Sequence, residues 1–393
     1  MTVRLAYLVT HPIHYQAPMI RRVAAEPDID LTVFFGSDFS TRSHVDAGFG
    51  RAVTWDVALT DGFRHEFLAE VSKPLQPGED TDFWRPRNRG LAGRLKQFDA
   101  LWVHGYHRAF HLQTMLQARM AGLRVLLRDE ATSISAQRSA LKQAVKRAFF
   151  WGVDRLVDGY LCIGSLNRDY YRSWGIAEAK LFDMPYAVDN DAFFARAQVA
   201  RSRREAFRAE LGLDHRPVLL FSGKLIARKR PFDVVDAVAT LPADQRPWVL
   251  FAGDGELRDA LSERIAALQL ERVRLLGFQS QLQLAALYDL ADIFVLPSER
   301  EAWGMVVNEA MTGGTAILVS DRIGAAPDLV KPGINGAHYP VGDTAALGAA
   351  LGDLVRDPAR LAAMGQASAD LIAGWNYDRD IRGLRAALGL SAR

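Results

Sequence analysis

The chain has 393 residues, of which 49% are hydrophobic and 24% charged, which excludes a disordered or fibrous protein and allows two or three domains. Its 48 Lys and Arg nearly balance 46 Asp and Glu, so the net charge of +2 gives no support for a nucleic-acid-binding protein. Cys162 is the single cysteine, and no apolar run approaches the length of a membrane-spanning helix. Together with the absence of a signal-peptide pattern, this predicts a cytoplasmic protein.

Short apolar segments alternate with helical segments through the first half of the chain. We expect strands at residues 3–10, 31–35, 100–103, 124–127, 160–163 and 181–184, and helices at 17–26 and 108–121. Alternating strands and helices are typical of a doubly wound parallel sheet, which places this half in the α/β class.

A charged helical segment at residues 195–211 precedes a second alternation of the same kind. We expect strands at 218–222, 248–252, 273–276, 293–296 and 316–320, and helices at 231–240, 256–267, 281–290, 303–312, 344–356, 358–372 and 377–388. The expected domains are therefore 1–190, 191–375 and a C-terminal segment, 376–393, that returns to the first domain. Ligands of such sheets bind at the carboxyl ends of the strands, so we expect a site in a cleft between the domains.

Two glutamates, Glu301 and Glu309, follow the fourth strand of the second domain in the segment EAWGMVVNE. The helix that begins between them offers free backbone N–H groups to a diphosphate, at Trp303, Gly304, Met305 and Val306. Carboxylates are suitable acceptors for sugar or ribose hydroxyls. The alternative is that both glutamates lie on a solvated helix face.

The first strand of the second domain ends at Gly223, and Lys224 and Lys229 follow it in FSGKLIARKRP. Two cations at the end of a strand can stabilise a bound or departing diphosphate. The alternative is a solvated basic loop, because Arg228 and Arg230 lie in the same run.

Five segments follow one another in the second half: FSGKLIARKRP, LFAGDGELRDAL, VRLLGF, LADIFVLPSEREAWGMVVNEAM and DLVKPGINGAHYPVGD. Across residues 216–345, their order and spacing resemble the donor-binding domain of the family 4 retaining glycosyltransferases, which are group 1 glycosyltransferases. A looser similarity covers the first half. The resemblance implies the GT-B fold of two Rossmann-like domains facing a central cleft. It also implies a nucleotide-sugar donor in the second domain, an acceptor mainly in the first, retention of configuration, and no metal or other cofactor.

The resemblance also assigns roles to individual residues. Lys224 and Lys229 match the cations on the donor phosphates, although the family more often has Arg at the first position. Glu301 matches the glutamate near the donor sugar, and Glu309 matches the one on the ribose. Three further positions match the base-binding end of the donor site: Gly253, Asp254 and Phe278.

The loop after the first strand, THPIHYQAP, lacks the glycine pair that the family usually has there. His11 and His14 lie in this loop and are candidates for contact with the diphosphate or the acceptor. The alternatives are a turn cap for His11 and a metal pair, which is disfavoured because no carboxylate or cysteine accompanies them. In VHGYHRAFH we expect His104 to face the cleft, and we interpret His107 and His111 as structural.

Asp129 follows the fourth strand of the first domain, where the resemblance places a residue near the reacting sugar or acceptor. Its carboxylate could orient the acceptor hydroxyl or accept its proton. The alternative is a helix cap, since Thr132 and Ser133 follow.

Residues 138–151 combine cations with aromatic side chains. The cations are Arg138, Lys142, Lys146 and Arg147, and the aromatic residues are Phe149, Phe150 and Trp151. A basic helix of this kind can lie on the anionic inner face of a membrane and would suit a lipid-linked acceptor. The alternative is that the rings belong to the core and the cations to a solvated face.

These patterns predict a retaining hexosyltransferase that moves a sugar from a UDP- or GDP-sugar to a glycan, lipid-linked or small-molecule acceptor. The expected role is polysaccharide, cell-surface glycan or glycolipid synthesis. Two alternatives remain: a non-hydrolysing sugar-nucleotide epimerase, and a sugar-nucleotide-binding protein without catalysis. A nicotinamide dehydrogenase is disfavoured because neither first strand leads into a GxGxxG motif.

Overall fold

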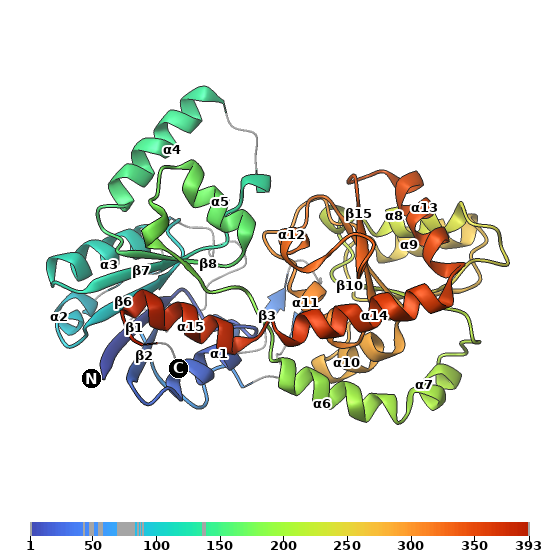
Figure 1. The fold of residues 1–393 in the computed structure, drawn as a ribbon, viewed down its shortest axis with the longest axis horizontal. Helices are drawn as coiled ribbons and strands as arrows, with labels where there is room; N and C mark the ends of the chain where they lie inside the picture. The colour runs from blue at the N-terminus through green and yellow to red at the C-terminus, as the bar shows by residue number, and fades with distance from the viewer. Residues whose placement is uncertain are drawn as a thin grey trace. The chain divides into compact units, whose positions relative to one another are not determined.

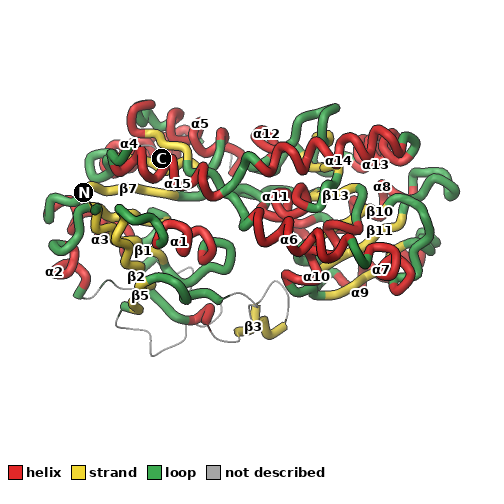
Figure 2. Tube along the Cα trace, turned by 60° about the horizontal axis from the view of Figure 1, so that its bottom comes forward, coloured by secondary structure: helices red, strands yellow, loops and turns green. Residues whose placement is uncertain are grey.

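The structure is a computed structural model that describes residues 2–41, 44–46, 51–53, 58–68, 83–84, 86, 88, 90–135 and 139–391. The chain forms two compact units. The first contains most of the chain up to Tyr186 together with Tyr377 onward, and the second contains Ala187–Asn376. The chain therefore leaves the first unit after Tyr186 and returns to it at Tyr377. Figures 1 and 2 show that each unit is a sheet with helices on both faces.

The sheet of the first unit has seven parallel strands in the order β5-β2-β1-β6-β7-β8-β9. The strands are β1 (Val3–Val9), β2 (Ile29–Phe35), β5 (Arg64–Phe67), β6 (Ala100–His104), β7 (Arg124–Arg128), β8 (Gly159–Cys162) and β9 (Leu181–Asp183). A separate two-stranded sheet pairs β3 (His44–Asp46) with β4 (Arg51–Val53). The helices are α1 (Ala17–Ala24), α2 (Leu91–Leu95), α3 (Ala109–Met120), α4 (Ala140–Val153), α5 (Ser165–Ser173) and α15 (Tyr377–Leu388).

Alternate residues of the central strand β1 pack into two separate hydrophobic cores, one on each face of the sheet. Ala6 and Leu8 pack in the core formed with α2, α3, α4 and α5. Leu5 and Tyr7 pack on the other face, with side chains from α1 and α15. Side chains alternate across a strand, so a buried parallel strand needs apolar residues at nearly every position. Figure 1 shows the C-terminal helix α15 beside the N-terminal helix α1 on this second face.

The second unit has a six-stranded parallel sheet in the order β12-β11-β10-β13-β14-β15. Its strands are β10 (Val218–Ser222), β11 (Trp248–Ala252), β12 (Val273–Gly277), β13 (Ile293–Leu296), β14 (Ala316–Ser320) and β15 (Gly336–Tyr339). Its helices are α6 (Asn190–Arg201), α7 (Arg204–Glu210), α8 (Pro231–Ala239), α9 (Arg258–Ala267), α10 (Gln281–Leu290), α11 (Met305–Thr312), α12 (Ala326–Leu329), α13 (Thr344–Val355) and α14 (Pro358–Ala373).

Each sheet reverses its strand order at its first strand. In the first unit β1 pairs with β2 on one side and β6 on the other, and in the second unit β10 pairs with β11 and β13. Ligands of doubly wound sheets bind at the carboxyl ends of the strands at this reversal. Ligands are therefore expected at the loops after β1, β6 and β7, and after β10, β11 and β13.

Both halves have the predicted α/β architecture of doubly wound parallel sheets. The predicted single helical segment at 195–211 is wrong in detail, because α6 already begins at Asn190 and α7 is a separate helix. The helix predicted to begin at Trp303 begins at Met305, after Gly304 in a left-handed conformation. Within the described ranges, no helix has both the length and the hydropathy that crossing a membrane requires.

Candidate functional site

A buried ion pair lies at the carboxyl edge of the second unit's sheet. Gly223 and Lys224 follow β10, and Lys229 ends the short 3-10 helix Ala227–Lys229 in the same loop. The Lys229 ammonium lies 2.6 Å from the Glu301 carboxylate, and each side chain is only 12% exposed. Arg228 reaches the same carboxylate at 3.2 Å. The basic segment after β10 and the glutamate segment after β13, which were predicted separately, are therefore in contact. Lys229 does not lie in a solvated loop and Glu301 does not lie on a solvated helix face, so these two alternatives are wrong.

Burial and pairing act against each other at this ion pair. Burial is the largest influence on the pKa of Lys229 and lowers it, and the charges of Arg228 and Lys224 add to this effect, so the pKa lies below its ordinary value although the adjacent Glu301 carboxylate raises it. Burial would raise the pKa of Glu301, but Lys229 and Arg228 outweigh it and hold that pKa below its ordinary value. Buried ion pairs contribute little net stability, and titratable groups with such shifts are concentrated at functional sites. The pair is thus better explained by binding than by folding.

The start of α11 lies next to Glu301 in the sequence. Gly304 has a φ of 100°, and a Cβ there would lie 3.1 Å from Ile323 and 3.2 Å from Leu296, so only glycine fits this turn. The indole of Trp303 is buried, stacks on Trp375 at 5.8 Å, and donates a 2.8 Å hydrogen bond to Asn308. The Trp303 ring therefore belongs to the core of the unit. Met305 and Val306, both half-buried, begin the helix whose first N–H groups lack intrahelical partners.

Glu309 lies inside α11 and is buried, so the alternative of a solvated face is wrong for it too. The Tyr288 hydroxyl donates to its carboxylate at 2.8 Å and also lies 3.3 Å from the Ser222 hydroxyl at the end of β10. Burial raises the pKa of Glu309 by more than the Tyr288 hydrogen bond lowers it. The sequence did not identify Tyr288, because its role depends on how α10 packs against α11.

The loops after β10 and β11 touch through their glycines. Gly223 donates to the Ala252 carbonyl at 3.0 Å, and Leu225 donates to the Asp254 carbonyl at 2.8 Å. A Cβ on Gly253 would lie 1.8 Å from the Gly223 carbonyl oxygen, so this approach requires glycine. Gly253 also donates to Gly277, and the half-buried Phe278 follows directly after β12. The predicted base-binding residues thus lie on adjacent loops at one edge.

A polar cluster occupies the corresponding edge of the first unit, around His104 at the end of β6. The Gln16 side-chain amide lies 3.1 Å and the Tyr186 hydroxyl 3.5 Å from the His104 ring. Glu130 accepts hydrogen bonds from both Tyr15 and Tyr186. Burial, and next the charge of Arg128, lower the pKa of His104 to about 3, so this imidazole is neutral at physiological pH. Of this cluster, only His104 was predicted from the sequence.

His11 and His14 lie in the loop after β1, half-buried. The Thr10 hydroxyl lies 2.9 Å from Nδ1 of His11, and the charge of protonated His11 contributes to lowering the pKa of His104. The His14 ring packs edge-on against Tyr15, with ring centroids 5.3 Å apart. Both histidines are therefore on the same edge as His104.

Asp129 lies directly after β7 with a side chain that is 4% exposed. Its Oδ1 accepts the Ala131 N–H at 2.8 Å, and its Oδ2 lies 3.0 Å from Nε2 of His107. Asp129 therefore bonds to the backbone of the turn after β7, rather than capping the next α-helix, whose N-cap is Ser139, and also pairs with an imidazole. His111 is buried, whereas His107 is exposed and was not expected to pair with Asp129.

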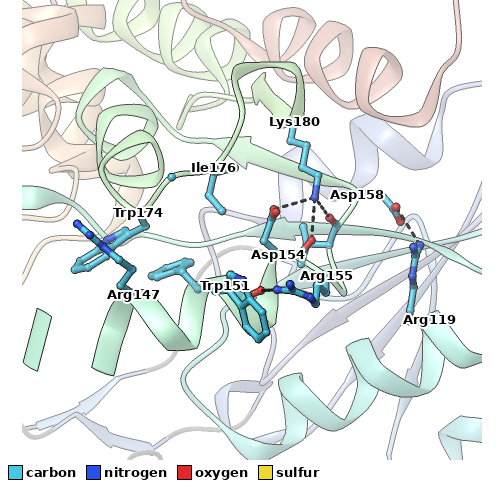
Figure 3. A pocket seen from close by; sticks show the side chains of 12 residues that line it. Arg119, Arg147, Trp151, Asp154, Arg155, Asp158, Trp174, Ile176 and Lys180 are labelled. Atoms are coloured by element: carbon cyan, nitrogen blue, oxygen red, sulfur yellow. Dashed lines mark hydrogen bonds and ion pairs between the residues drawn. The ribbon is translucent and has the colours of Figure 1, made fainter. Parts of the chain in front are cut away.

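The described residues enclose a cavity of about 730 Å³ at the opposite edge of the first unit's sheet. It is lined by residues before β8 and β9, including Asp158 and Lys180, and by the end of α4, including Arg147 and Trp151. Figure 3 shows Lys180 bonded to Asp154 and Arg119 bonded to Asp158 within it. None of the predicted donor or acceptor residues lines it. Among the described residues, no group of three or more His, Cys, Asp and Glu is arranged to hold a metal ion.

Residues 140–151 of the predicted basic and aromatic segment form most of α4, while Arg138 lies outside the described residues. Phe150 is buried in the core, as one alternative predicted, but Trp151 is 65% exposed. Leu141 and Val145 are also exposed, at 76% and 64%. The outer part of α4 therefore carries apolar side chains beside its cations.

The family model that matches this chain lies within the second unit. Residues 203–370 match the family model of the glycosyl transferases group 1. The alpha-D-kanosaminyltransferase of Streptomyces kanamyceticus is 33% identical over 173 residues, which are 42% of this chain and 45% of that protein. The D-inositol 3-phosphate glycosyltransferase of Nocardia farcinica is 34% identical over 191 residues, or 46% and 42% of the two chains. The chain thus spans less than half the length of these relatives.

Solved structures match over the whole chain. HepE of Anabaena, crystallised with UDP, has a TM-score of 0.71 at 15% identity and covers 98% of this chain and 100% of its own. A glycosyltransferase from Rickettsia africae has a TM-score of 0.73 at 14% identity, covering 99% and 100%. At such low identity the likeness concerns the fold alone. The chain therefore has the predicted GT-B fold, and its second unit has the sequence pattern of the group 1 glycosyltransferases.

Proposed function

We propose that the chain is a retaining glycosyltransferase of family 4 that moves a sugar from a UDP- or GDP-sugar to an acceptor hydroxyl. The observation that carries this proposal is the buried pair of Lys229 and Glu301 at the edge of the second unit's sheet, within the stretch that matches group 1 glycosyltransferases. HepE, a structural neighbour, was also crystallised with UDP-glucose (TM-score 0.69). This supports a nucleotide-sugar donor.

The proposed donor site distributes the charge of the diphosphate over the chain's own groups. Lys224, Lys229 and the first N–H groups of α11 bind the phosphates and stabilise the charge that grows as the nucleoside diphosphate leaves. Glu301 then accepts hydrogen bonds from the donor sugar, and Glu309 from the ribose. We propose that no metal is needed, and that the acceptor binds at the first unit near His11, His14 and His104.

We further propose that the enzyme is a cytoplasmic protein that contacts the inner face of a membrane through α4 and builds a cell-surface glycan or glycolipid. The exposed apolar side chains of α4 and its neighbouring cations support this contact. A lipid-linked acceptor would be presented at the same surface.

The proposed function is tested by incubating the protein with UDP-, GDP- and ADP-sugars, with and without an acceptor panel. We expect release of nucleoside diphosphate that depends on the acceptor and persists in a chelator. Glu301→Ala should lower turnover at least 100-fold, because the donor loses a hydrogen-bond acceptor and Lys229 loses its partner. Glu299→Ala, an exposed neighbour, is the matched control and should keep full activity. An epimerised sugar, or binding without turnover, would contradict transfer.

A further inference from the structure

The cavity at the amino edge of the first unit's sheet has no part in the proposed transfer. Asp158 lies just before β8 and Lys180 just before β9, so this edge is opposite to the one that carries His104 and Asp129. Its volume of about 730 Å³ is of the size that binds small ligands. A ligand held there would therefore differ from the donor and from an acceptor at the carboxyl edge.

The buried part of the lining is apolar. Phe150, Val157 and Ile176 line the cavity and are each at most 5% exposed. Trp174, another lining residue, stacks on Phe150 with the ring centroids 5.7 Å apart and the planes inclined by 11°. Trp151 lines the same cavity from α4 and is 65% exposed. The lining thus offers apolar contacts from its interior out to the protein surface.

The charged part of the lining has more cations than carboxylates. It consists of four cations and two carboxylates: Arg119, Arg147, Arg155, Lys180, Asp154 and Asp158. Lys180 pairs with Asp154 at 2.9 Å, and Arg119 pairs with Asp158 at 3.1 Å. Over the part of the chain that the structure describes, Arg147 and Arg155 have no carboxylate partner. The excess positive charge therefore belongs to these two arginines and favours an anionic ligand.

The guanidinium of Arg155 is held in place by Trp151. Its Cζ atom lies 3.2 Å from the centre of the indole ring, and its Nη1 donates to the Trp151 carbonyl at 2.6 Å (Figure 3). A guanidinium has five N–H donors in a planar fork, so several N–H groups remain for a ligand after this bond. Phosphate is a preferred partner of arginine, and because it carries more than one free oxygen it can accept from Arg147 and Arg155 together.

The position of the cavity on α4 indicates where such a phosphate comes from. Arg147 and Trp151 are four residues apart in α4 and so project from one face of this helix. The same helix carries the exposed side chains of Leu141 and Val145, through which we propose that it contacts a membrane. Tryptophan and arginine side chains together are typical of the headgroup layer, where an apolar surface adjoins anionic phosphates.

We propose that this cavity binds the phosphate of one anionic phospholipid, with Arg147 and Arg155 donating to its oxygens and the glycerol part against Trp151 and Trp174. The inference deepens the proposed membrane contact of α4 and rests on it. Apolar side chains that enter a bilayer give affinity for any lipid, whereas this cavity selects the headgroup. A zwitterionic headgroup binds more weakly, because its own cation meets a lining that already has an excess of positive charge.

Short-chain lipids test the site without a bilayer. In calorimetric titrations, dihexanoylphosphatidylglycerol below its micelle-forming concentration should bind saturably, and dihexanoylphosphatidylcholine roughly tenfold more weakly or less still. Arg147→Gln combined with Arg155→Gln should weaken binding of the anionic lipid by roughly tenfold or more, because two charged donors are lost. Lys142→Gln combined with Arg124→Gln removes the same charge from exposed residues of the first unit outside the cavity. This matched control should bind within about twofold of wild type.

Three results would overturn the inference. Absence of saturable binding would remove the site, and unchanged affinity in the Arg147 and Arg155 variant would place the lipid elsewhere. Inorganic phosphate or glycerol 3-phosphate that binds as tightly as the lipid would identify a free phosphate compound as the ligand.

Each of these results is separate from the proposed function. An enzyme that transfers sugar in the absence of lipid, and binds no short-chain lipid, overturns this inference and leaves glycosyl transfer standing. Vesicle binding without binding of the short-chain lipid overturns the cavity and leaves the membrane contact of α4. A protein that binds the lipid but turns over no donor overturns glycosyl transfer and supports the lipid site.

Discussion

The carboxyl group of Glu309 is buried at a position where an apolar side chain would destabilise the fold less. It is buried inside α11, and the hydroxyl of Tyr288 donates to it. Burying a carboxylate is unfavourable unless it is hydrogen-bonded, and here burial raises its pKa despite Tyr288. The presence of Glu309 at this buried position is more readily explained by binding of a ligand than by a contribution to stability.

Replacing the donor of this hydrogen bond tests how the site holds Glu309. Tyr288→Phe should destabilise the chain by about 1–3 kcal/mol, because a buried acceptor loses its partner. The loss should be larger at pH 8 than at pH 5, since the ionised carboxylate needs the donor more than the protonated form does. Urea unfolding at both pH values measures this. Tyr339→Phe is the control, because among the described residues the buried Tyr339 hydroxyl has no hydrogen-bond partner. Equal losses in the two variants at both pH values would contradict this role for Tyr288.

At the level of single residues, the sequence identified the charged groups but not what they touch. The spacing in EAWGMVVNE indicated Glu301 and Glu309, and the basic run indicated Lys229. These charged residues could be identified because their pattern is local in the sequence. That Arg228 also reaches Glu301, and that Tyr288 lies against Glu309, depends on packing between segments far apart in the chain. The contact of His107 with Asp129 was missed for the same reason, since Asp129 follows another strand, β7.

At the level of elements, burial decided which strands could be predicted. The central strands are continuous apolar runs, such as β10 (Val218–Ser222) with every residue buried, and they were predicted nearly to the residue. The edge strand β5 of the first sheet, with the sequence RHEF, and the edge strand β15 of the second sheet, with GAHY, were not predicted. An edge strand is covered on fewer sides and tolerates polar residues, so these two sequences carry little strand signal, whereas the edge strands β9 and β12 have more apolar residues and were predicted.

Helix α4 packs through its C-terminal part, where Phe150 and Val153 are its buried residues. Leu141 and Val145 are 76% and 64% exposed. If α4 lies on a membrane, these side chains enter the lipid while the cations beside them meet anionic headgroups. The apolar side chains are therefore the ones to change, because they distinguish insertion from simple charge attraction.

The combined variant Leu141→Ser and Val145→Ser should bind vesicles of phosphatidylglycerol and phosphatidylcholine at least tenfold more weakly than wild type. Burying two such side chains is worth a few kcal/mol, of which only part is gained at an interface. Cosedimentation measures the bound fraction. Val199→Ser with Leu282→Ser, equally exposed residues of the second unit, is the matched control and should bind like wild type. A wild type that stays in the supernatant would contradict membrane contact.

At the scale of the whole molecule, one buried side chain, that of Arg128, contacts the chain both where it leaves the first unit and where it returns to it. The Arg128 guanidinium, 1% exposed, donates to the carbonyls of Met184 at 2.8 Å and Pro185 at 3.1 Å, just before the chain leaves the unit. It also pairs at 3.3 Å with Asp380 of α15, just after the chain returns. The apolar face of α15 could be read from the sequence, but this anchor could not, because its members lie 252 residues apart.

The Arg128–Asp380 pair makes the docking of α15 sensitive to pH. Burial raises the pKa of Asp380 from 3.8 to about 7, by more than Arg128 lowers it. The folded state therefore favours the protonated carboxyl, and the stability this provides is complete below the unfolded pKa and is lost as pH rises through about 7. Among the described residues, Oδ2 of Asp380 has no hydrogen-bond partner, which accounts for the cost of ionising it.

Asp380→Asn keeps the shape of the side chain and removes its titration. Relative to wild type, its free energy of unfolding should increase between pH 4 and pH 8, by at most on the order of 4 kcal/mol at 1.36 kcal/mol per pKa unit. Arg128→Met should instead destabilise at every pH by about 3–5 kcal/mol, because it leaves Asp380 and two carbonyls buried without their donor. Urea unfolding of the three proteins, with hydrogen exchange over α15, separates these effects. Parallel pH profiles for wild type and Asp380→Asn would show that this carboxyl does not titrate on unfolding and that α15 docks independently of its charge.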